Sequence, residues 1–317
     1  MRYLNPSPRS LARLALLCSL TVAGGCDRIL GLERDPKLAD GPWRCLTDTG
    51  ERWDAPRMPK KSTALVRVLA CDLATDCAAR INVDVKVCGR RDEDCNQPLD
   101  TEVTWVENEL RFEALTGIDG FAGYLDFTSP TAPCTDEGVF GPEAGELCKW
   151  CPSGSAGDDP ENPEAAQCEL PLYLNQRYFI SPPVIDDMEF PLRMFVLPLP
   201  AALAELEAAG VNYDRTKAIM VALARDCDGT PAAEVFFENE QESAVPLLQL
   251  GGVLTKPSDT LMATDASGAM VFVNVDPGSA VVHGFGPDGL EFGDAGISVK
   301  PFTVNVTPVF PNRFSPP

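Results

Sequence analysis

The sequence predicts an all-β protein in which two tandem β-sandwiches are joined by one short helix. Three observations lead to this fold class. Most apolar segments alternate between apolar and polar residues with a period of two, which is typical of half-buried strands. Only residues 200–211 have the composition of a helix. Strands and turns also follow one another in the same order in both halves of the chain, which indicates a repeat.

The chain begins with a segment typical of an export signal. Three arginines precede an apolar stretch over residues 14–25, and this stretch is too short to span a bilayer. Small residues then lead to Cys26. We therefore predict a lipoprotein signal peptide over residues 1–25.

Cys26 stands in a pattern that resembles the lipobox of bacterial lipoproteins. In those proteins the cysteine is lipidated and becomes the first residue of the mature chain. The four residues are Ala23-Gly24-Gly25-Cys26, and Ala23 departs from the usual leucine. The resemblance implies a membrane anchor of the palmitate type at Cys26. It also implies a place in the bacterial cell envelope, on the outer membrane, the cell surface or the periplasmic face. Ordinary signal cleavage, with Cys26 in a disulfide, is the alternative.

Net charge limits the partners of the mature chain. The formal charge of −21 becomes −24 once the three arginines of the signal are removed. Such a surface repels the phosphate backbone, so we expect no nucleic-acid partner. Apolar residues make up 44% of the chain, which is enough for a core. The 317 residues, less the 25 of the signal, suggest about two domains.

Cysteine usage indicates an oxidising compartment. Ten cysteines remain once the signal and the lipidated Cys26 are set aside. An even number in an exported chain predicts up to five disulfides, whose pairing the sequence alone cannot choose. The ten are Cys45, Cys71, Cys77, Cys88, Cys95, Cys134, Cys148, Cys151, Cys168 and Cys227.

Spacing favours two local pairs. Cys71 and Cys77 flank one short polar turn, and Cys88 and Cys95 flank another, as staples across strand ends would. The other six lie farther apart: Cys134 and Cys168 bracket a loop that holds Cys148 and Cys151, while Cys45 and Cys227 are left to tie the entry segment to the second sandwich.

The first half is predicted to form one sandwich over residues 63–198, after a tether and entry segment over residues 26–62. An irregular insertion rich in glycine, proline and aspartate interrupts it at residues 131–169. Alternating β-branched and aromatic residues indicate the strands. We expect them at residues 64–73, 81–89, 109–115, 123–130, 172–180 and 189–198.

A connecting helix is predicted over residues 199–212. Alanine, leucine and glutamate favour a helix there, and Gly210 is suited to its end. The second sandwich is predicted over residues 213–317, where strand patterns resume. They lie within residues 218–239, 249–263, 269–275, 279–285 and 297–310.

Two segments of the second half, DCDGTPAAEVFF and TDASGAMVFVNVDPGSAVV, resemble the carboxypeptidase regulatory-like domain, which has a transthyretin-like β-sandwich fold. The match covers about residues 219–310, and the first half follows it loosely, without the TD-x-x-G turn. The residues that fill the pattern are Asp226, Asp228, Gly229, Pro231, Val235, Thr264, Asp265, Gly268, Phe272, Pro277 and Gly278.

The resemblance implies a fold and no catalysis. In metallocarboxypeptidases this domain accompanies a catalytic domain whose zinc pattern needs several histidines, whereas this chain has only His283. We expect His283 to be structural, because it ends a strand and a catalytic triad needs partners within hydrogen-bond reach. The layout also resembles two-sandwich lipoproteins of myxobacteria and their relatives.

Two further groups have the residue types of a site. Cys148 and Cys151 form a CxxC motif, which is used for redox chemistry or, with other thiolates, for zinc. Export favours disulfides there instead. Asp226, Asp228 and Asp265 are candidate calcium ligands, but calcium takes about six oxygens and tight turns use the same residues.

We therefore expect a non-catalytic, lipid-anchored envelope or surface protein without a cofactor. Its role would be structural or binding, toward an unidentified protein or polysaccharide. The alternative is a carbohydrate- or substrate-binding accessory module of a secreted enzyme system. A redox or metal-dependent protein that uses the CKWC loop is a third class.

Overall fold

The structure is a computed structural model, and it describes twelve segments of the chain. The described part is mostly strand and contains one helix, α5, at Leu199–Ala208. All of it belongs to one compact unit, Trp53–Pro317. The described residues are 62–72, 81–116, 120–133, 169–180, 183–184, 186–188, 192–227, 229–250, 253–258, 262–286, 289 and 291–311.

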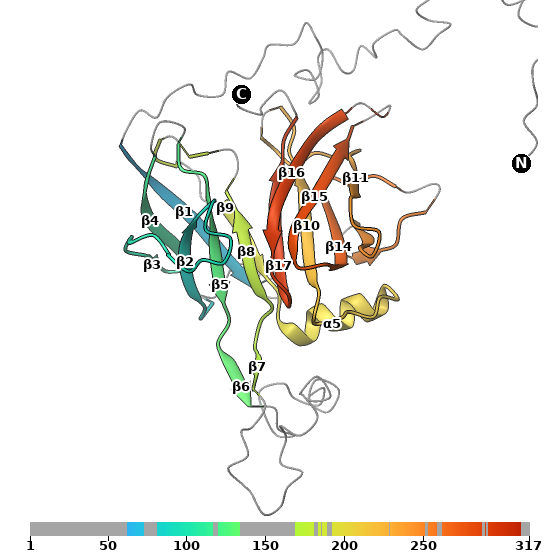
Figure 1. Cartoon of the computed structure of the whole chain (residues 1–317), viewed down its shortest axis with the longest axis horizontal. Coiled ribbons are helices and arrows are strands. Elements are labelled where there is room, and N and C mark those ends of the chain that lie inside the picture. The colour runs from blue at the N-terminus through green and yellow to red at the C-terminus, as the bar shows by residue number, and fades with distance from the viewer. Residues whose placement is uncertain are drawn as a thin grey trace, which may run out of the picture. The chain divides into compact units, whose positions relative to one another are not determined.

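A four-stranded sheet forms one layer of the first half (Figure 1). Its strand β1 (Thr63–Asp72) pairs antiparallel with β4 (Glu109–Leu115) and parallel with β9 (Leu192–Val196). Ala64, Val66 and Val68 alternate with more exposed residues, so the period of two seen in the sequence gives this strand one buried face. The order is β3 (Thr104–Val106), β4 (Glu109–Leu115), β1 (Thr63–Asp72) and β9 (Leu192–Val196).

Three more strands of the first half pair antiparallel with one another. A disulfide between Cys88 and Cys95 closes the turn that follows the first of them, as the spacing predicted. The strands are β2 (Asp84–Gly89), β5 (Gly123–Thr128) and β8 (Asn175–Phe179), with β5 in the middle.

The second half repeats these pairings. Its β10 pairs antiparallel with β14 and parallel with β17, as β1 does with β4 and β9. A separate layer, β11-β15-β16, is antiparallel throughout, like β2-β5-β8. The strands are β10 (Ala218–Ala224), β11 (Phe236–Asn239), β12 (Val245–Leu250), β13 (Val253–Thr255), β14 (Ala269–Val275), β15 (Gly278–Phe285), β16 (Glu291–Val299) and β17 (Thr303–Val309).

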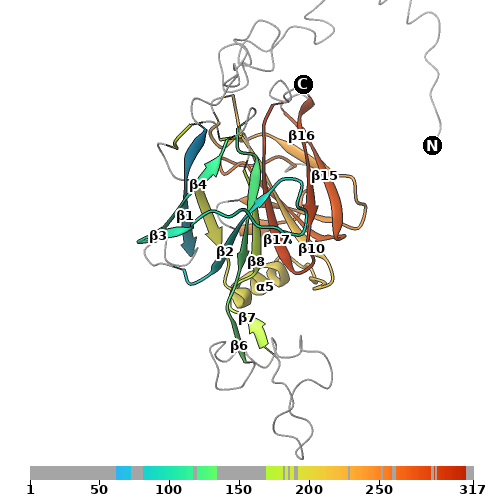
Figure 2. The ribbon, with the colours of Figure 1, turned by 60° about the vertical axis from the view of Figure 1, so that its left-hand side comes forward.

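One sheet runs through both halves. β17 pairs in parallel with β8, from Thr303 opposite Asn175 to Val306 opposite Tyr178. The result is an eight-stranded sheet in the order β13-β12-β14-β10-β17-β8-β5-β2. Figures 1 and 2 both show β8 beside β17, where the two halves meet. The sequence indicated only a helix as the connection between the halves, whereas a hydrogen-bonded ladder also joins them.

The shared sheet has a different cover on each face. Tyr178, Val306 and Val221 lie on one face by register, and a single apolar core joins this face to the four-stranded layer and to α5. Arg177, Asn305 and Met220 lie on the other face. There Asn239 of β11 donates to the sulfur of Met220 at 3.7 Å, so the three-stranded layer covers this face. The two smaller layers therefore lie on opposite faces of the shared sheet.

Helix α5 agrees with the segment predicted at 199–212. It follows Pro198, and Leu199, Ala202 and Leu206 are buried on one side. Gly210 has a φ of +69° and donates to the carbonyl of Glu207, which ends the helix in the way expected of a glycine. Figure 1 shows α5 beside one end of the shared sheet.

The predicted insertion at 131–169 begins and ends in a short ladder. β6 (Thr131–Pro133) pairs antiparallel with β7 (Glu169–Pro171), and the residues between them lie outside the described part. Together with β3, these strands are missing from the sequence prediction, because three residues are too few to display a period. Most of β12 and most of β16 also lie outside the predicted strand ranges. Among the described residues, no helix has both the length and the apolar character that a membrane span requires.

Candidate binding groove

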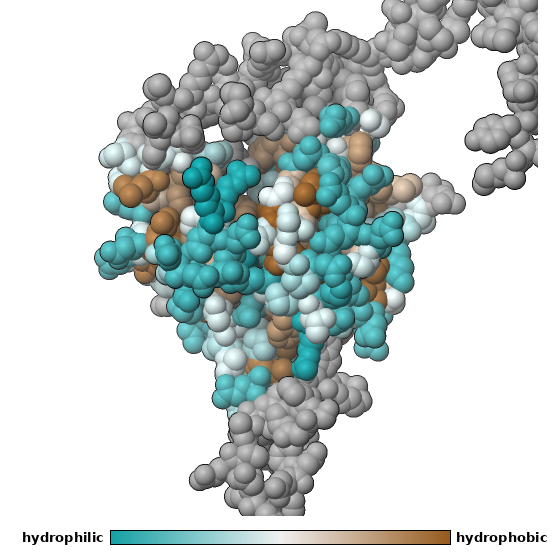
Figure 3. All heavy atoms as spheres, in the orientation of Figure 1, coloured by the Kyte–Doolittle hydropathy of each residue, from teal (hydrophilic) through white to brown (hydrophobic). Residues whose placement is uncertain are grey.

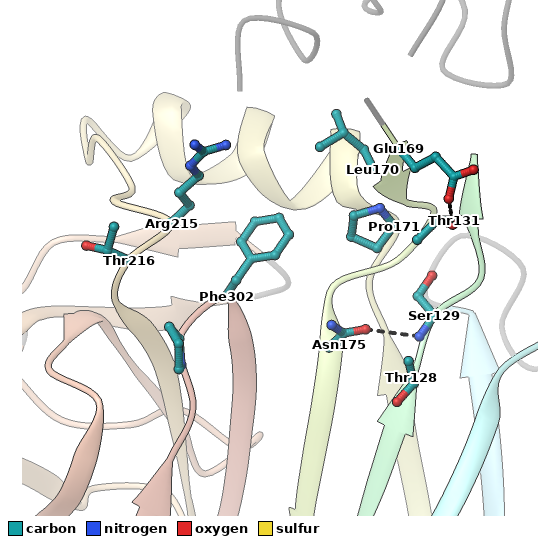
Figure 4. A pocket seen from close by; sticks show the side chains of 11 residues that line it. Thr128, Ser129, Thr131, Glu169, Leu170, Pro171, Asn175, Arg215, Thr216 and Phe302 are labelled. Atoms are coloured by element: carbon teal, nitrogen blue, oxygen red, sulfur yellow. Dashed lines mark hydrogen bonds between the residues drawn. The ribbon is translucent and has the colours of Figure 1, made fainter. Parts of the chain in front are cut away.

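A groove of about 610 Å³ lies where strand ends of the two halves meet. The first half contributes the ends of β5 and β8 with the β6–β7 ladder, and the second half contributes the turns before β10 and β17 (Figure 4). The β8–β17 ladder brings these segments together. The groove is lined by Thr128, Ser129, Thr131, Glu169, Leu170, Pro171, Asn175, Arg215, Thr216, Pro301 and Phe302.

Hydrogen bonds fix the polar wall from the first half. Asn175 accepts from the backbone N–H of Ser129 at 3.0 Å, which turns the amide nitrogen of Asn175 away from Ser129 (Figure 4). The Ser129 hydroxyl accepts from the N–H of Tyr173 at 2.9 Å. Thr131 donates to the Glu169 carboxylate across the β6–β7 ladder. These bonds hold one donor amide and one carboxylate at fixed places on this wall.

The second half supplies an aromatic ring and a cation. The Phe302 ring stacks on Tyr213, with centroids 6.4 Å apart and an interplanar angle of 11°. Burial raises the pKa of Tyr213, and its hydroxyl donates to the carbonyl of Lys217 at 3.0 Å. Arg215 is exposed in the turn before β10, and no carboxylate of the described part forms an ion pair with it.

Asp214 organises that turn. Its carboxylate accepts from both the N–H and the hydroxyl of Thr216, at 2.8 and 2.7 Å. These hydrogen bonds lower the pKa of Asp214. The backbone N–H of Asp214 in turn donates to Asn274 at 2.8 Å. Arg215 is therefore presented from a turn that its neighbours hold in place.

The lining combines charged, polar and aromatic side chains. They offer a guanidinium, a carboxylate, an amide, several hydroxyls and a phenyl ring, and they include neither histidine nor cysteine. Ligand sites in proteins usually combine apolar and aromatic surfaces with a few placed polar groups. Sequence reasoning missed this groove, because its walls are more than 80 residues apart in places and meet only through strand pairing.

His283 lies on β15, where neighbouring strands supply a carboxylate to each side of its ring. Nδ1 is 2.8 Å from Asp294 of β16, and Nε2 is 3.0 Å from Glu240, which follows β11. The hydrogen bonds to Asp294 and then to Glu240 raise the pKa of His283. Because both ring nitrogens are engaged, neither is free to serve a nucleophile in this arrangement.

The aspartates considered for calcium serve turns. Asp226 is 6% exposed and accepts from the N–H and hydroxyl of Thr230 at 2.9 and 2.7 Å. Asp265 accepts from the N–H and hydroxyl of Ser267 at 2.8 and 2.6 Å. Asp228 lies outside the described residues. These bonds are the side-chain to backbone pattern of tight turns.

Thr264 links the two segments that carry the family resemblance. Its hydroxyl donates to the carbonyl of Ala232 at 3.0 Å and accepts from the N–H of Val235 at 3.2 Å. Gly268 adopts a φ of +68° directly against Ala224 and Ala232. These residues therefore form a buried structural corner.

Within the part that the structure describes, one group of potential metal ligands gathers closely: Cys88, Cys95 and Asp126. Its two sulfurs are joined in the disulfide, so they are not available as thiolates. Cys227 is also disulfide-bonded. The other predicted cysteine side chains lie outside the described part, so their pairing and the lipidation of Cys26 stay predictions. They are Cys45, Cys71, Cys77, Cys134, Cys148, Cys151 and Cys168.

Comparison with known proteins assigns no family. No protein-family model matches the chain, and no curated protein matches it. Among solved structures, the chain is similar to one titled "Structure of the Streptococcal ancillary pilin", with 10% sequence identity and a TM-score of 0.21. The alignment covers 78% of this chain and 68% of that chain. A likeness at this TM-score carries no argument about fold or function.

Proposed function

We propose that this chain is a non-catalytic, lipid-anchored protein of the cell envelope that binds a partner through the groove between its halves. The observation that carries the proposal is the groove itself. A stacked Phe302, a fixed Asn175 amide and opposed charges on Arg215 and Glu169 line one site. The ligand would be an extended polar segment of a protein or a polysaccharide.

The fold proposed for this role is a pair of transthyretin-like sandwiches of the carboxypeptidase regulatory-like kind. The repeated pairing of β1 with β4 and β9, and of β10 with β14 and β17, supports it. The Thr264 corner supports the resemblance on which the family rests. In this view the second half contributes one sheet of its sandwich to the shared sheet.

Phe302 and Asn175 also favour a second candidate, a carbohydrate-binding accessory module of a secreted enzyme system. A phenyl ring whose orientation is set by Tyr213 offers a flat surface for a sugar ring. The Asn175 amide and the Glu169 carboxylate offer the donor and acceptor that neighbouring hydroxyls require.

A pulldown from the native envelope tests the groove. We expect the wild-type protein to retain a partner that Arg215→Ala loses by about tenfold or more, because a charged hydrogen bond contributes about 1.5–3 kcal/mol. Arg90→Ala is the matched control, since it removes an exposed arginine outside the groove. Equal retention by both variants contradicts the assignment of the groove. A glycan array with the same proteins separates sugars from protein partners.

Separate experiments test the lipid anchor and the alternative of a redox or metal-dependent protein that uses the CKWC loop. Radiolabelled palmitate should enter the wild-type protein and be absent from Cys26→Ser, and labelling that survives the substitution rules out this lipid site. Thiol titration of the native protein addresses the CKWC motif. Two free thiols there would favour redox or metal chemistry, whereas none is expected of a disulfide staple.

A further inference from the structure

A row of polar side chains crosses the junction between the two halves. Lys86 of β2 stands opposite Asp126 of β5, which stands opposite Arg177 of β8, which stands opposite Asn305 of β17. All four lie on the same face of the shared sheet, because residues directly opposite each other share a face. The row continues on β10 with Met220, where it becomes apolar.

Arg177 is the buried member of this row. It is 0% exposed, and its Nε, Nη1 and Nη2 atoms have no hydrogen-bond partner in the described structure. Its guanidinium lies over the Tyr124 ring, 4.9 Å from the ring centroid. Arg177 forms an ion pair with Asp126, with 3.5 Å between Arg177 Nη2 and Asp126 Oδ2, but the two atoms do not form a hydrogen bond. A buried guanidinium normally has acceptors for its N–H groups, because a buried donor without an acceptor is destabilising.

A second cation uses the same carboxylate. Lys300, at the end of β16, lies 3.3 Å from Asp126 and donates to the carbonyl of Asp94 at 2.8 Å. One carboxylate thus faces two cations, Arg177 and Lys300. Lys86 adds a third, exposed cation beside Asp126. Arg177 and Lys300 therefore share a single ion-paired carboxylate, Asp126, and the charge of Asp92 also acts on the Tyr124 ring beneath Arg177.

The disulfide loop contacts two neighbours of Arg177, Tyr124 and Lys300. The Tyr124 hydroxyl donates to the carbonyl of Asp92, in the turn that Cys88–Cys95 closes. The Asp92 carboxylate accepts from the N–H groups of Asn96 and Gln97, at 3.0 and 2.7 Å. These hydrogen bonds orient the Asp92 carboxylate toward its own loop. On the side seen in Figure 3, hydrophilic side chains dominate the described surface around β2, β5 and β8.

We propose that Arg177 holds a small monovalent anion of halide size at Nε and Nη1. Such an ion supplies the acceptor that the buried N–H groups lack, and it balances the second cation beside Asp126. An ordered water is the competing occupant, since water also accepts hydrogen bonds but leaves the charge unbalanced.

Crystals grown in sodium bromide test the proposal directly. We expect an anomalous peak at hydrogen-bonding distance from Arg177 Nε and Nη1. Full occupancy by a light atom, without anomalous signal, identifies a water and overturns the proposal.

Two substitutions with opposite expected signs test it in solution. Asp126→Asn removes the competing negative charge and should tighten bromide binding by about fivefold or more, whereas Lys300→Met should weaken it by a similar factor. Binding is measured as the rise in melting temperature with bromide at constant ionic strength. Lys256→Met, which removes an exposed lysine elsewhere, is the control and should behave as wild type. No bromide dependence in any variant, or the same dependence in all of them, overturns the proposal. Groove binding through Arg215 is measured separately, so failure of one proposal leaves the other intact.

Discussion

Substituting Gly268 by alanine should destabilise the protein far more than the same change at a second left-handed glycine. Gly268 has a φ of +68°, and an added Cβ would lie 2.6 Å from the carbonyl oxygen of Ala224 and 2.9 Å from the nitrogen of Ala232. Both are backbone atoms, so neither can move aside without disturbing the strand ends. Gly229 has a φ of +78°, but an added Cβ would meet nothing within 4 Å.

The expected loss of stability has two contributions, the left-handed backbone conformation and the contact of the added Cβ with backbone atoms. A left-handed conformation costs a non-glycine residue about 1–2 kcal/mol, and both variants carry this cost. At Gly268 the displaced groups also make hydrogen bonds, from Ala224 N to Gly268 O at 2.7 Å and from Ala232 N to Ala224 O at 3.0 Å. Weakening each of these bonds costs about 1 kcal/mol. Gly268→Ala should therefore lose about 3–4 kcal/mol in total, and Gly229→Ala about 1–2 kcal/mol.

Urea unfolding under oxidising conditions measures the difference. The midpoint of Gly268→Ala should fall roughly twice as far as that of Gly229→Ala, with the same m-value in both variants. Equal shifts in the two variants would refute the reasoning, because the close approach of Gly268 to the backbone would then contribute nothing.

Three other predictions concern charges and the disulfide. His283 has a raised pKa in the folded state, so its contribution to stability is complete below about pH 6.5 and is lost as the pH rises through the folded value. His283→Gln should flatten this part of the stability–pH curve, and an unchanged curve contradicts the assignment. Glu109 has its pKa lowered to about 2, first by the hydrogen bond from Arg67, so its contribution is present above about pH 4.5 and is lost on acidification toward pH 2. Glu109→Gln should lower the free energy of unfolding in urea by about 1–2 kcal/mol at neutral pH. It should also remove the loss of stability that the wild-type protein shows between about pH 4.5 and pH 2. Replacing Cys88 and Cys95 by alanine should lower the free energy of unfolding by about 2 kcal/mol, as measured by calorimetry. If the variant were as stable as the wild-type protein, the disulfide would not contribute to stability.

Periodicity locates most of the strands, and composition locates the helix. ELRFEAL alternates so regularly that the strand predicted at 109–115 has the bounds of β4. The helix can be inferred because alanine, leucine and glutamate cluster once, before Gly210. The pair Cys88–Cys95 can be inferred because a short polar turn leaves two nearby strand-end sulfurs little choice of partner.

Long-range pairing cannot be inferred in the same way. Nothing in LYLNQRYFI indicates that its strand meets β17 rather than a neighbour in sequence, because a parallel ladder has no turn signal between its strands. Arg177 follows Gln176 in that segment and looks like a solvent-facing residue. It is buried, and its guanidinium lies beside the Tyr124 ring and the Asp126 carboxylate of the neighbouring strand. The groove escapes detection for the same reason.

The parallel β8–β17 ladder also sets an order of assembly. β17 follows every other described strand in the chain, yet it lies between β10 and β8 and bonds to both. During synthesis it emerges after them, so β8 and β10 each keep an open edge until it arrives. Parallel contacts between distant segments form slowly, which prolongs the time for which these edges can pair wrongly. Insertion of one late strand therefore completes both halves in the same step.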